Sequence, residues 1–204
     1  MQSVSNNHKV ILRSYFRSKR NRISDRDWAD RSTAIHNHIV HAKWYNSAKT
    51  VHSYVSMNHR KEANTHRLIQ EILGSDKRLM VPVMQTNRSL QHVHVQDWNE
   101  LIPNEWGVME PKSQVFIEPM DIDVVLVPLL AIDGFGNRLG YGAGYYDSFL
   151  KDLTPSTITV GLVFNDFVVK KLPVDSWDIP LDAFVTERGF FPCNHNKELP
   201  YTKI

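Results

Sequence analysis

The sequence predicts an α/β fold: a single three-layer α/β/α domain, spanning residues 1–204, around a mainly parallel sheet. A length of 204 residues suits one domain with a sizeable core. Strand-like and helix-like segments alternate along the chain, which is typical of parallel strands joined by crossover helices. The run DVVLVPLLAID at 123–133 is nearly all apolar, as expected of a central parallel strand that is covered on both faces.

The N-terminal fifth of the chain is predicted to be helical. Residues 9–22 place apolar side chains among basic ones with helical spacing. Ser24, followed three residues later by Asp27, is similar to a capping box. This pattern predicts a second helix that runs through Ile35 and Ile39.

The middle of the chain reads as strand, helix and strand, over 50–57, 65–74 and 78–84, which implies a parallel crossover. The next segment, 90–98, alternates polar and apolar residues, so we expect a half-exposed strand with His92 and His94 on its polar side. Further expectations are a long irregular connection, a short helix and a buried strand, at 99–121, 144–153 and 156–164.

Composition and charge exclude several classes of protein. The contents of 42% hydrophobic and 23% charged residues are those of an ordinary globular protein. No apolar run approaches the ~20 residues of a membrane span, and the polar first residues lack the apolar core of a signal peptide. Cys193 is the only cysteine, so no internal disulfide can form and a reducing compartment is expected. We therefore expect a cytoplasmic protein without a membrane partner.

Positive charge is concentrated near the start of the chain. The net charge is only +2, but eight Lys and Arg residues lie within the first 31 residues. Such a cluster is typical either of a solvated helix face, in which one or two members bind a phosphate, or of a nucleic-acid arm.

The stretch DGFGNRLGYGAGYYDSFL, at 133–150, holds five of the nine glycines. It follows the best central strand and leads into a helix, which is where open α/β sheets bind ligands. Glycines there let backbone amides approach an anion, and Arg138 can add a bidentate contact. A carboxylate beside phosphates, here Asp147, calls for a hard cation such as Mg²⁺, and Asp133 either shares this role or caps the turn. The stretch is neither a dinucleotide-binding fingerprint nor a P-loop, and a purely structural loop remains an alternative.

This central block resembles the signature of the 5-formyltetrahydrofolate cyclo-ligases, also called methenyltetrahydrofolate synthetases. Supporting matches follow in order along the chain: KVILR, EANT, WGVMEP and LPVDSWDIPLDAFVTE. The resemblance implies a Rossmann-like sheet of the NagB/RpiA/CoA-transferase type. It also implies a ligase that converts 5-formyltetrahydrofolate and ATP to 5,10-methenyltetrahydrofolate, ADP and phosphate with Mg²⁺. We expect a monomer whose partners are these small molecules and not nucleic acid.

The resemblance also implies roles for individual residues. Lys9 and Arg13 match an ATP-binding pair, with Lys9 and Arg138 as catalytic cations. Asp147 and Asp178 match Mg²⁺ ligands. The phosphate-binding loop is matched by Arg138, Leu139, Gly140, Tyr141, Gly142, Ala143, Gly144, Tyr145 and Tyr146. The folate is expected to contact Glu62, Val55, Trp106 and Tyr146.

Two other classes of function remain open at this point. One is a nucleotide or RNA binder without catalysis, which would need exposed aromatic side chains among the N-terminal charges; Tyr15 and Phe16 are expected to be buried instead. The other is a phosphate-handling enzyme such as a sugar-phosphate isomerase. The histidines at 36–41 and 92–94 are interpreted as ordinary polar residues and not as metal ligands.

Overall fold

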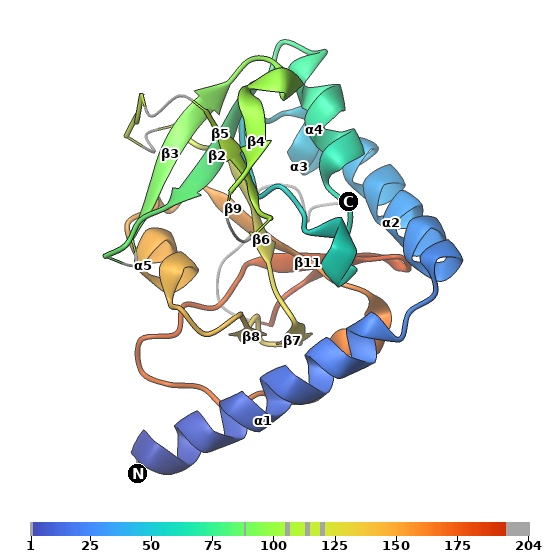
Figure 1. Cartoon of the computed structure of the whole chain (residues 1–204), viewed down its shortest axis with the longest axis vertical. Helices are drawn as coiled ribbons and strands as arrows, with labels where there is room; N and C mark the ends of the chain where they lie inside the picture. The colour runs from blue at the N-terminus through green and yellow to red at the C-terminus, as the bar shows by residue number, and fades with distance from the viewer. Residues whose placement is uncertain (1, 88, 105–106, 113–114, 119–120, 195–204) are drawn as a thin grey trace.

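The computed structural model describes residues 2–87, 89–104, 107–112, 115–118 and 121–194, with side chains from residue 7 onward. A seven-stranded sheet forms its centre, in the order β12-β11-β9-β6-β1-β2-β3 (Figure 1). The two edge strands, β12 and β3, are antiparallel to their neighbours, and the other pairings are parallel. The strands are β1 (Thr50–Ser53), β2 (Arg78–Met84), β3 (Leu90–Val95), β6 (Val124–Pro128), β9 (Ile158–Leu162), β11 (Ala183–Thr186) and β12 (Gly189–Pro192). The predicted α/β fold with a mainly parallel sheet is confirmed.

Helices cover both faces of this sheet (Figure 1). One face carries α2 (Asp25–Val40), α3 (Lys43–Asn46) and α4 (His66–Leu73), and the other carries α5 (Tyr145–Lys151). The ring of His52 in β1 packs against Phe149 of α5. Since adjacent strand residues point to opposite faces, Val51 faces the α2–α4 layer. The connections between these elements contain short 3₁₀ helices at Asn58–Arg60, Trp98–Glu100 and Asn165–Phe167.

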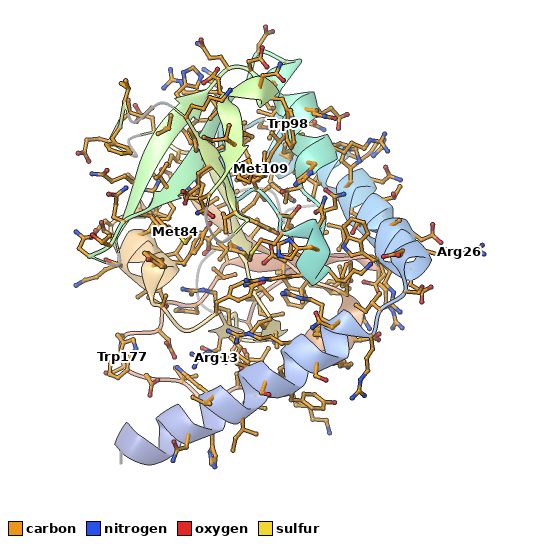
Figure 2. All side chains as sticks on the ribbon, in the orientation of Figure 1. Arg13, Arg26, Met84, Trp98, Met109 and Trp177 are labelled. Atoms are coloured by element: carbon orange, nitrogen blue, oxygen red, sulfur yellow. The ribbon has the colours of Figure 1, made fainter. Side chains whose placement is uncertain are left out.

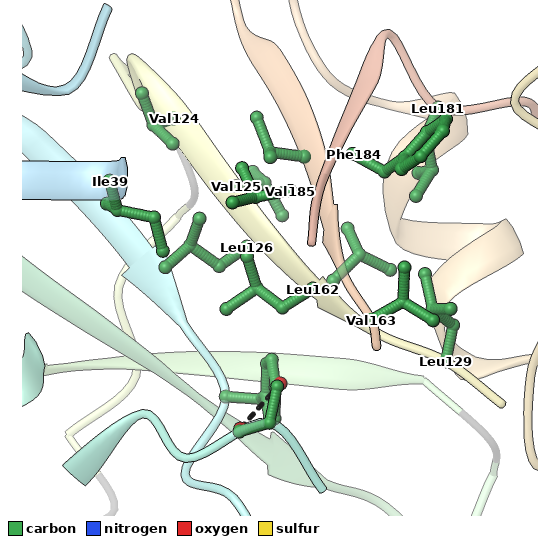
Figure 3. Packing of buried hydrophobic residues seen from close by; sticks show 14 of the residues in the cluster. Ile39, Val124, Val125, Leu126, Leu129, Leu162, Val163, Leu181, Phe184 and Val185 are labelled. Carbon is green, nitrogen blue, oxygen red and sulfur yellow. Dashed lines mark hydrogen bonds between the residues drawn. The ribbon is translucent and has the colours of Figure 1, made fainter. Parts of the chain in front are cut away.

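The core lies between the sheet and these helices. The first four residues of β6, Val124 to Val127, are fully buried. Figure 3 shows part of this cluster, with Ile39 of α2 beside the β6 side chains. The predicted start of α2 is confirmed, because the Ser24 hydroxyl accepts a hydrogen bond of 3.1 Å from the amide of Asp27.

The apolar run at 123–133 is not one strand. It forms β6, and then β7 (Ala131–Asp133) in a separate sheet of order β10-β7-β8, with β8 (Arg138–Leu139) and β10 (Val168–Val169). The run leaves the large sheet after Pro128, and the amide of Leu130 instead donates to the carbonyl of Leu139 at 2.7 Å. Hydrophobicity marked both strands as buried but carried no signal of the change of sheet.

Two further expectations need correction. The connection at 99–121 is not wholly irregular, because β4 (Leu101–Pro103) pairs with β5 (Met109–Pro111). The other correction concerns His92, which is buried and not on an exposed polar face, because α5 covers that face of the β3 edge.

Helix α1 (Gln2–Asn21) runs across the loops that follow β6 and β9, with the small sheet between it and the large one (Figure 1). The Lys19 ammonium donates to the carbonyl of Asp166 at 2.6 Å, after β9. Phe16 is buried as expected, but Tyr15 is 58% exposed because it lies on the outer face of the helix. No helix within the described part of the chain is long and apolar enough to span a membrane.

Candidate active site

A cavity of about 910 Å³ opens at the carboxyl ends of the parallel strands. Its walls come from α1, the segment after β1, the glycine loop at 140–147 and the segment 175–178. Figure 2 shows its two ends: Arg13 and Trp177 lie toward α1, whereas Met84 and Met109 lie toward the sheet. The cavity is therefore basic at one end and apolar at the other.

The basic end is built by cations spaced four residues apart on α1. Lys9, Arg13 and Arg17 project from one helical face toward the cavity, as the sequence predicted for the first two. The Nε atom of Arg13 donates to the carbonyl of Gly140 at 3.0 Å, and Nη2 of Arg17 donates to that of Tyr141 at 3.1 Å. Burial and the nearby charge of Arg17 lower the pKa of Arg13. Hydrogen bonds thus hold two of the cations of α1 against the backbone of the glycine loop.

The glycines of the loop have different tasks. At Gly136, φ is +81° and an added Cβ would lie 2.2 Å from the carbonyl oxygen of Leu181, so this glycine serves the fold. At Gly142, φ is +104° and a Cβ would lie 3.1 Å from the Cζ atom of Arg13. The loop from Gly142 to Gly144 is exposed to the cavity, and its backbone can approach an anion without obstruction. A purely structural role therefore explains Gly136. It does not explain the exposed glycines at 142 and 144, which face the cavity.

Each predicted metal ligand is paired with a cation. Nη2 of Arg138 donates to Oδ1 of Asp147 at 2.7 Å, and the Lys9 ammonium lies 2.5 Å from Oδ2 of Asp178 and 2.7 Å from Oδ2 of Asp175. Burial lowers the pKa of Arg138, and the charge of Asp147 opposes this effect. The two ion pairs bring four of the predicted residues together.

The carboxylates fit one mode of Mg²⁺ binding. No group of three or more His, Cys, Asp or Glu side chains in the described residues forms a complete metal cage. Mg²⁺ usually binds through one or two carboxylates together with phosphate oxygens and water. Within the described residues, hydrogen bonds to Asp147 reach only Oδ1 and those to Asp178 reach only Oδ2. Each carboxylate therefore has a second oxygen for a cation that arrives with phosphates.

The buried carboxylate of Glu62 lies at the start of the apolar end of the cavity. Glu62 is 4% exposed, and burial raises its pKa, although Arg20 and hydrogen bonds oppose the rise. Its Oε2 atom accepts from the amide of Met57 at 2.7 Å, and its Oε1 atom accepts from the hydroxyl of Tyr141. The Trp28 indole donates to its carbonyl at 2.6 Å. Glu62 is held rigidly and can accept a further N–H from a ligand in the cavity.

Two of the three remaining predicted folate contacts, Val55 and Tyr146, belong to the described residues, and both line the cavity near Glu62. Val55 is buried and lines the cavity. The hydroxyl of Tyr146 is buried and has no hydrogen-bond partner among the described residues, so it can bond to a polar ligand group. Trp106 lies outside the described residues.

Other predicted residues are placed away from the cavity. Leu139 pairs with Ala131, and its side chain is buried in the core. Asp133 is also fully buried, and it caps the turn by accepting hydrogen bonds from the amides of Phe135 and Asn137. Asp133 therefore has the second of the two roles considered for it.

Among the charged residues that the sequence did not single out, Arg17 and Asp175 line the cavity, and Arg20 contacts the hydroxyl of Tyr141 in its wall. The two arginines continue the spacing of Lys9 and Arg13 by further turns of the helix, so a helical projection would have found them. Asp175 had no comparable pattern, because only tertiary structure brings it to Lys9.

Comparison with known proteins gives a consistent result. The sequence model of the 5-formyltetrahydrofolate cyclo-ligase family matches residues 5–187. The chain is 36% identical over 144 residues to the Escherichia coli K12 5-formyltetrahydrofolate cyclo-ligase, which covers 68% of this chain and 78% of that protein. It is 28% identical over 209 residues to the mitochondrial 5-formyltetrahydrofolate cyclo-ligase of Arabidopsis thaliana. This match covers 90% of this chain and 76% of the Arabidopsis protein.

Solved structures are similar as well. The 5,10-methenyltetrahydrofolate synthetase of Aquifex aeolicus superposes with a TM-score of 0.81 at 29% identity, over 96% of this chain and 97% of that one. The Mycoplasma pneumoniae synthetase, at 22% identity and a TM-score of 0.70 over 88% and 98%, shares the fold.

Proposed function

The chain belongs to the 5-formyltetrahydrofolate cyclo-ligase family, and we propose that its cavity is where the enzyme converts 5-formyltetrahydrofolate to 5,10-methenyltetrahydrofolate with ATP. The observation that carries this assignment is the polarity of the cavity. Cations and exposed loop backbone form one end, and a buried carboxylate with apolar neighbours forms the other. A triphosphate suits the first end and a pterin ring suits the second.

At the basic end, the phosphates of ATP lie against residues 140–144. Arg138 neutralises charge that develops on the transferred phosphoryl group, and Lys9 and Arg13 neutralise the remaining oxygens. Asp147 and Asp178 would hold Mg²⁺, which would offset the negative charge of the phosphates. The ion pairs of Asp147 with Arg138 and of Asp178 with Lys9 keep these carboxylates oriented.

At the apolar end, Glu62 accepts an N–H of the pterin, and the Tyr146 hydroxyl bonds a second polar group of the ring. Val55 lines this part of the cavity, and Trp106 is proposed as a further folate contact. The formyl oxygen attacks the γ-phosphorus of ATP and ADP leaves. N10 then attacks the activated carbon to close the ring, the C–O bond to phosphate breaks, and the proton of N10 leaves with the departing phosphate. The protein supplies position and charge and no nucleophile.

The whole chain, 1–204, acts as one domain and one monomeric catalyst of small molecules. No contribution from nucleic acid or a membrane is required for these steps, and the location that we propose is the cytoplasm.

The direct test is to incubate the purified protein with 5-formyltetrahydrofolate, ATP and Mg²⁺ and to follow the absorbance of methenyltetrahydrofolate. We expect product in proportion to ATP, and none when ATP is omitted. Absence of ATP-dependent product would refute the proposed reaction.

The metal assignment has its own test. Replacing Asp147 by Asn removes charge from the cation site, so we expect the Mg²⁺ concentration for half-maximal rate to rise by about 10-fold. Asp152→Asn is the matched control, because Asp152 is exposed at the far end of α5 and should leave the titration unchanged. A magnesium titration that is the same for Asp147→Asn and the wild type would contradict the assignment.

A further inference from the structure

Arg20 is a buried cation to which the steps above give no role. It is 5% exposed, and its Nη2 atom donates to the Tyr141 hydroxyl at 2.7 Å. Its guanidinium carbon also lies 5.5 Å from the centre of the Tyr141 ring. Burial of a guanidinium is costly, and its Nε atom has no hydrogen-bond partner within the described chain. The contact that offsets this cost is the one with Tyr141.

Tyr141 connects Arg20 to the folate end of the cavity. Its hydroxyl accepts from Arg20 and donates to Oε1 of Glu62. A phenol hydroxyl can do both at once, since it carries one donor and two acceptor positions. The backbone of Tyr141 belongs to the loop that we assign to ATP, but its side chain points to Glu62. The side chain therefore serves a different ligand from the loop that carries it.

The charges around Glu62 oppose the cost of its burial. Burial raises the pKa of Glu62, and Arg20 is the largest opposing influence, followed by the hydrogen bonds from Tyr141 and Met57 and then by Arg60. Burial raises the pKa of two further phenols, Tyr54 and Tyr146, and the nearby Glu62 charge adds to the rise in each. Arg20 is thus the principal cation that favours the ionised carboxylate.

We infer that Arg20 is a positioning residue for the folate, acting through the Tyr141 hydroxyl to hold the Glu62 carboxylate in place for the pterin. This inference rests on the proposed function, in which Glu62 binds the folate. The three residues come from α1, the glycine loop and the segment after β1, and the hydrogen bonds join them in one line. Through the Tyr141 hydroxyl, folate binding thus depends on the position of α1. The same helix carries the cations that we assign to ATP.

Kinetics of single and double variants test the line of contacts. Tyr141→Phe removes one oxygen, and Arg20→Gln removes the charge; each should raise the KM for 5-formyltetrahydrofolate by about 10-fold, as expected for a lost hydrogen bond in a charged network. The KM for ATP should change by less than about 2-fold. Because both changes cut one path, the double variant should be no worse than the poorer single variant.

The pH profile separates positioning from a merely structural role. Loss of the Arg20 charge raises the pKa of Glu62, so the acid limb of kcat/KM for the folate should move to higher pH. Arg20→Lys keeps a charge and should restore the limb in part. Arg22→Gln is the matched control, because Arg22 is an exposed arginine in the turn directly after the end of α1. A structural role alone would lower thermal stability without moving the limb.

The outcomes are distinct. If the wild-type enzyme turns over and both single variants keep its folate KM and acid limb, the inference is overturned and the proposed function stands. If the wild type makes no product, the proposed function fails, and titration calorimetry with 5-formyltetrahydrofolate decides the inference: weaker binding by the variants supports it, and equal or absent binding overturns it. If Arg20→Gln does not fold, Tyr141→Phe carries the test.

Discussion

Among the single residues that line the cavity, Gly142 is the one at which a side chain is least easily accommodated. Alanine there must adopt a φ of +104°, and its Cβ must displace the Arg13 guanidinium from 3.1 Å. Strain of this kind costs about 1–2 kcal/mol for a residue other than glycine. We therefore expect Gly142→Ala to raise the KM for ATP by about 10-fold, measured in the absorbance assay.

The control for this variant lies in the same stretch. Gly134 has no atom within 4 Å of an added Cβ, so Gly134→Ala should leave the KM for ATP unchanged. An unaltered KM in Gly142→Ala would show that the loop is not held in this conformation when ATP binds.

Arg138 is the residue on which the chemistry is expected to depend most. Its side chain is 5% exposed, it donates to the carbonyl of Ile179, and it forms the 2.7 Å ion pair with Asp147. Removal of one such charge-stabilising group typically lowers kcat by about 10²–10³, and we expect this loss for Arg138→Ala. The measurement is kcat at saturating substrates, with circular dichroism to check the fold.

Arg26→Ala provides the comparison, because Arg26 is exposed on α2 at the opposite side of the molecule (Figure 2). Its activity should equal that of the wild type. If Arg138→Ala were equally active, Arg138 would have only a structural role.

At the scale of elements, the contact of β1 and β3 with α5 contains a buried pair of histidines. Nε2 of His52 lies 3.0 Å from Nδ1 of His92, and both rings pack on Phe149. Burial lowers the pKa of both, that of His92 to about 4 and that of His52 well below its usual value. Both are therefore neutral in the folded protein near neutral pH.

This pair makes stability depend on pH in a defined direction. Unfolded histidine titrates near 6.5, so below that pH the unfolded chain binds protons that the folded chain excludes. The contribution is complete above about pH 6.5 and is lost as the pH falls toward 4, by at most about 1.4 kcal/mol per pH unit for each histidine. Urea unfolding at several pH values measures the slope.

Variants isolate the pair from other titrating groups. His92→Gln should have a shallower loss of stability between pH 6.5 and 4 than the wild type. His38→Gln, at an exposed position of α2, should keep the wild-type slope. Equal slopes for His92→Gln and the wild type would show that the pair is not the source.

Helix α1 illustrates what can be predicted for an element and what cannot. Its helical character and the shared face of Lys9 and Arg13 follow from the spacing of residues in the sequence. Its docking does not, because Lys9 meets Asp178, 169 residues away in the chain, and Arg20 meets Tyr141, 121 residues away. Contacts of such separation leave no local pattern.

At the scale of the whole molecule, the seven-stranded sheet and the ion pairs of α1 tie distant segments into one unit. We expect a single unfolding transition in calorimetry, for a monomer of 23.6 kDa. ATP at 100 times its dissociation constant should stabilise the protein by about 2.7 kcal/mol, which raises Tm by about 5–10 °C. Two separate transitions would contradict the single domain, and an Arg138→Ala variant should show a smaller shift with ATP.

The sequence by itself determined the alternation of strands and helices, the buried central strand, the α2 cap and the glycine-rich loop that follows this strand. These depend on local spacing and residue type, which periodicity reports directly. It also separated Asp147 from the glycines as a residue that needs a cation beside it.

Only the tertiary structure decided how these parts meet. It divided the run at 123–133 between two sheets, buried His92 beneath α5, and brought the Tyr141 hydroxyl to Glu62. It also brought Arg20 to the Tyr141 hydroxyl and Asp175 to Lys9. The physical reason is that burial and ion pairing depend on neighbours far away in the chain, and such neighbours are chosen when the sheet and α1 assemble.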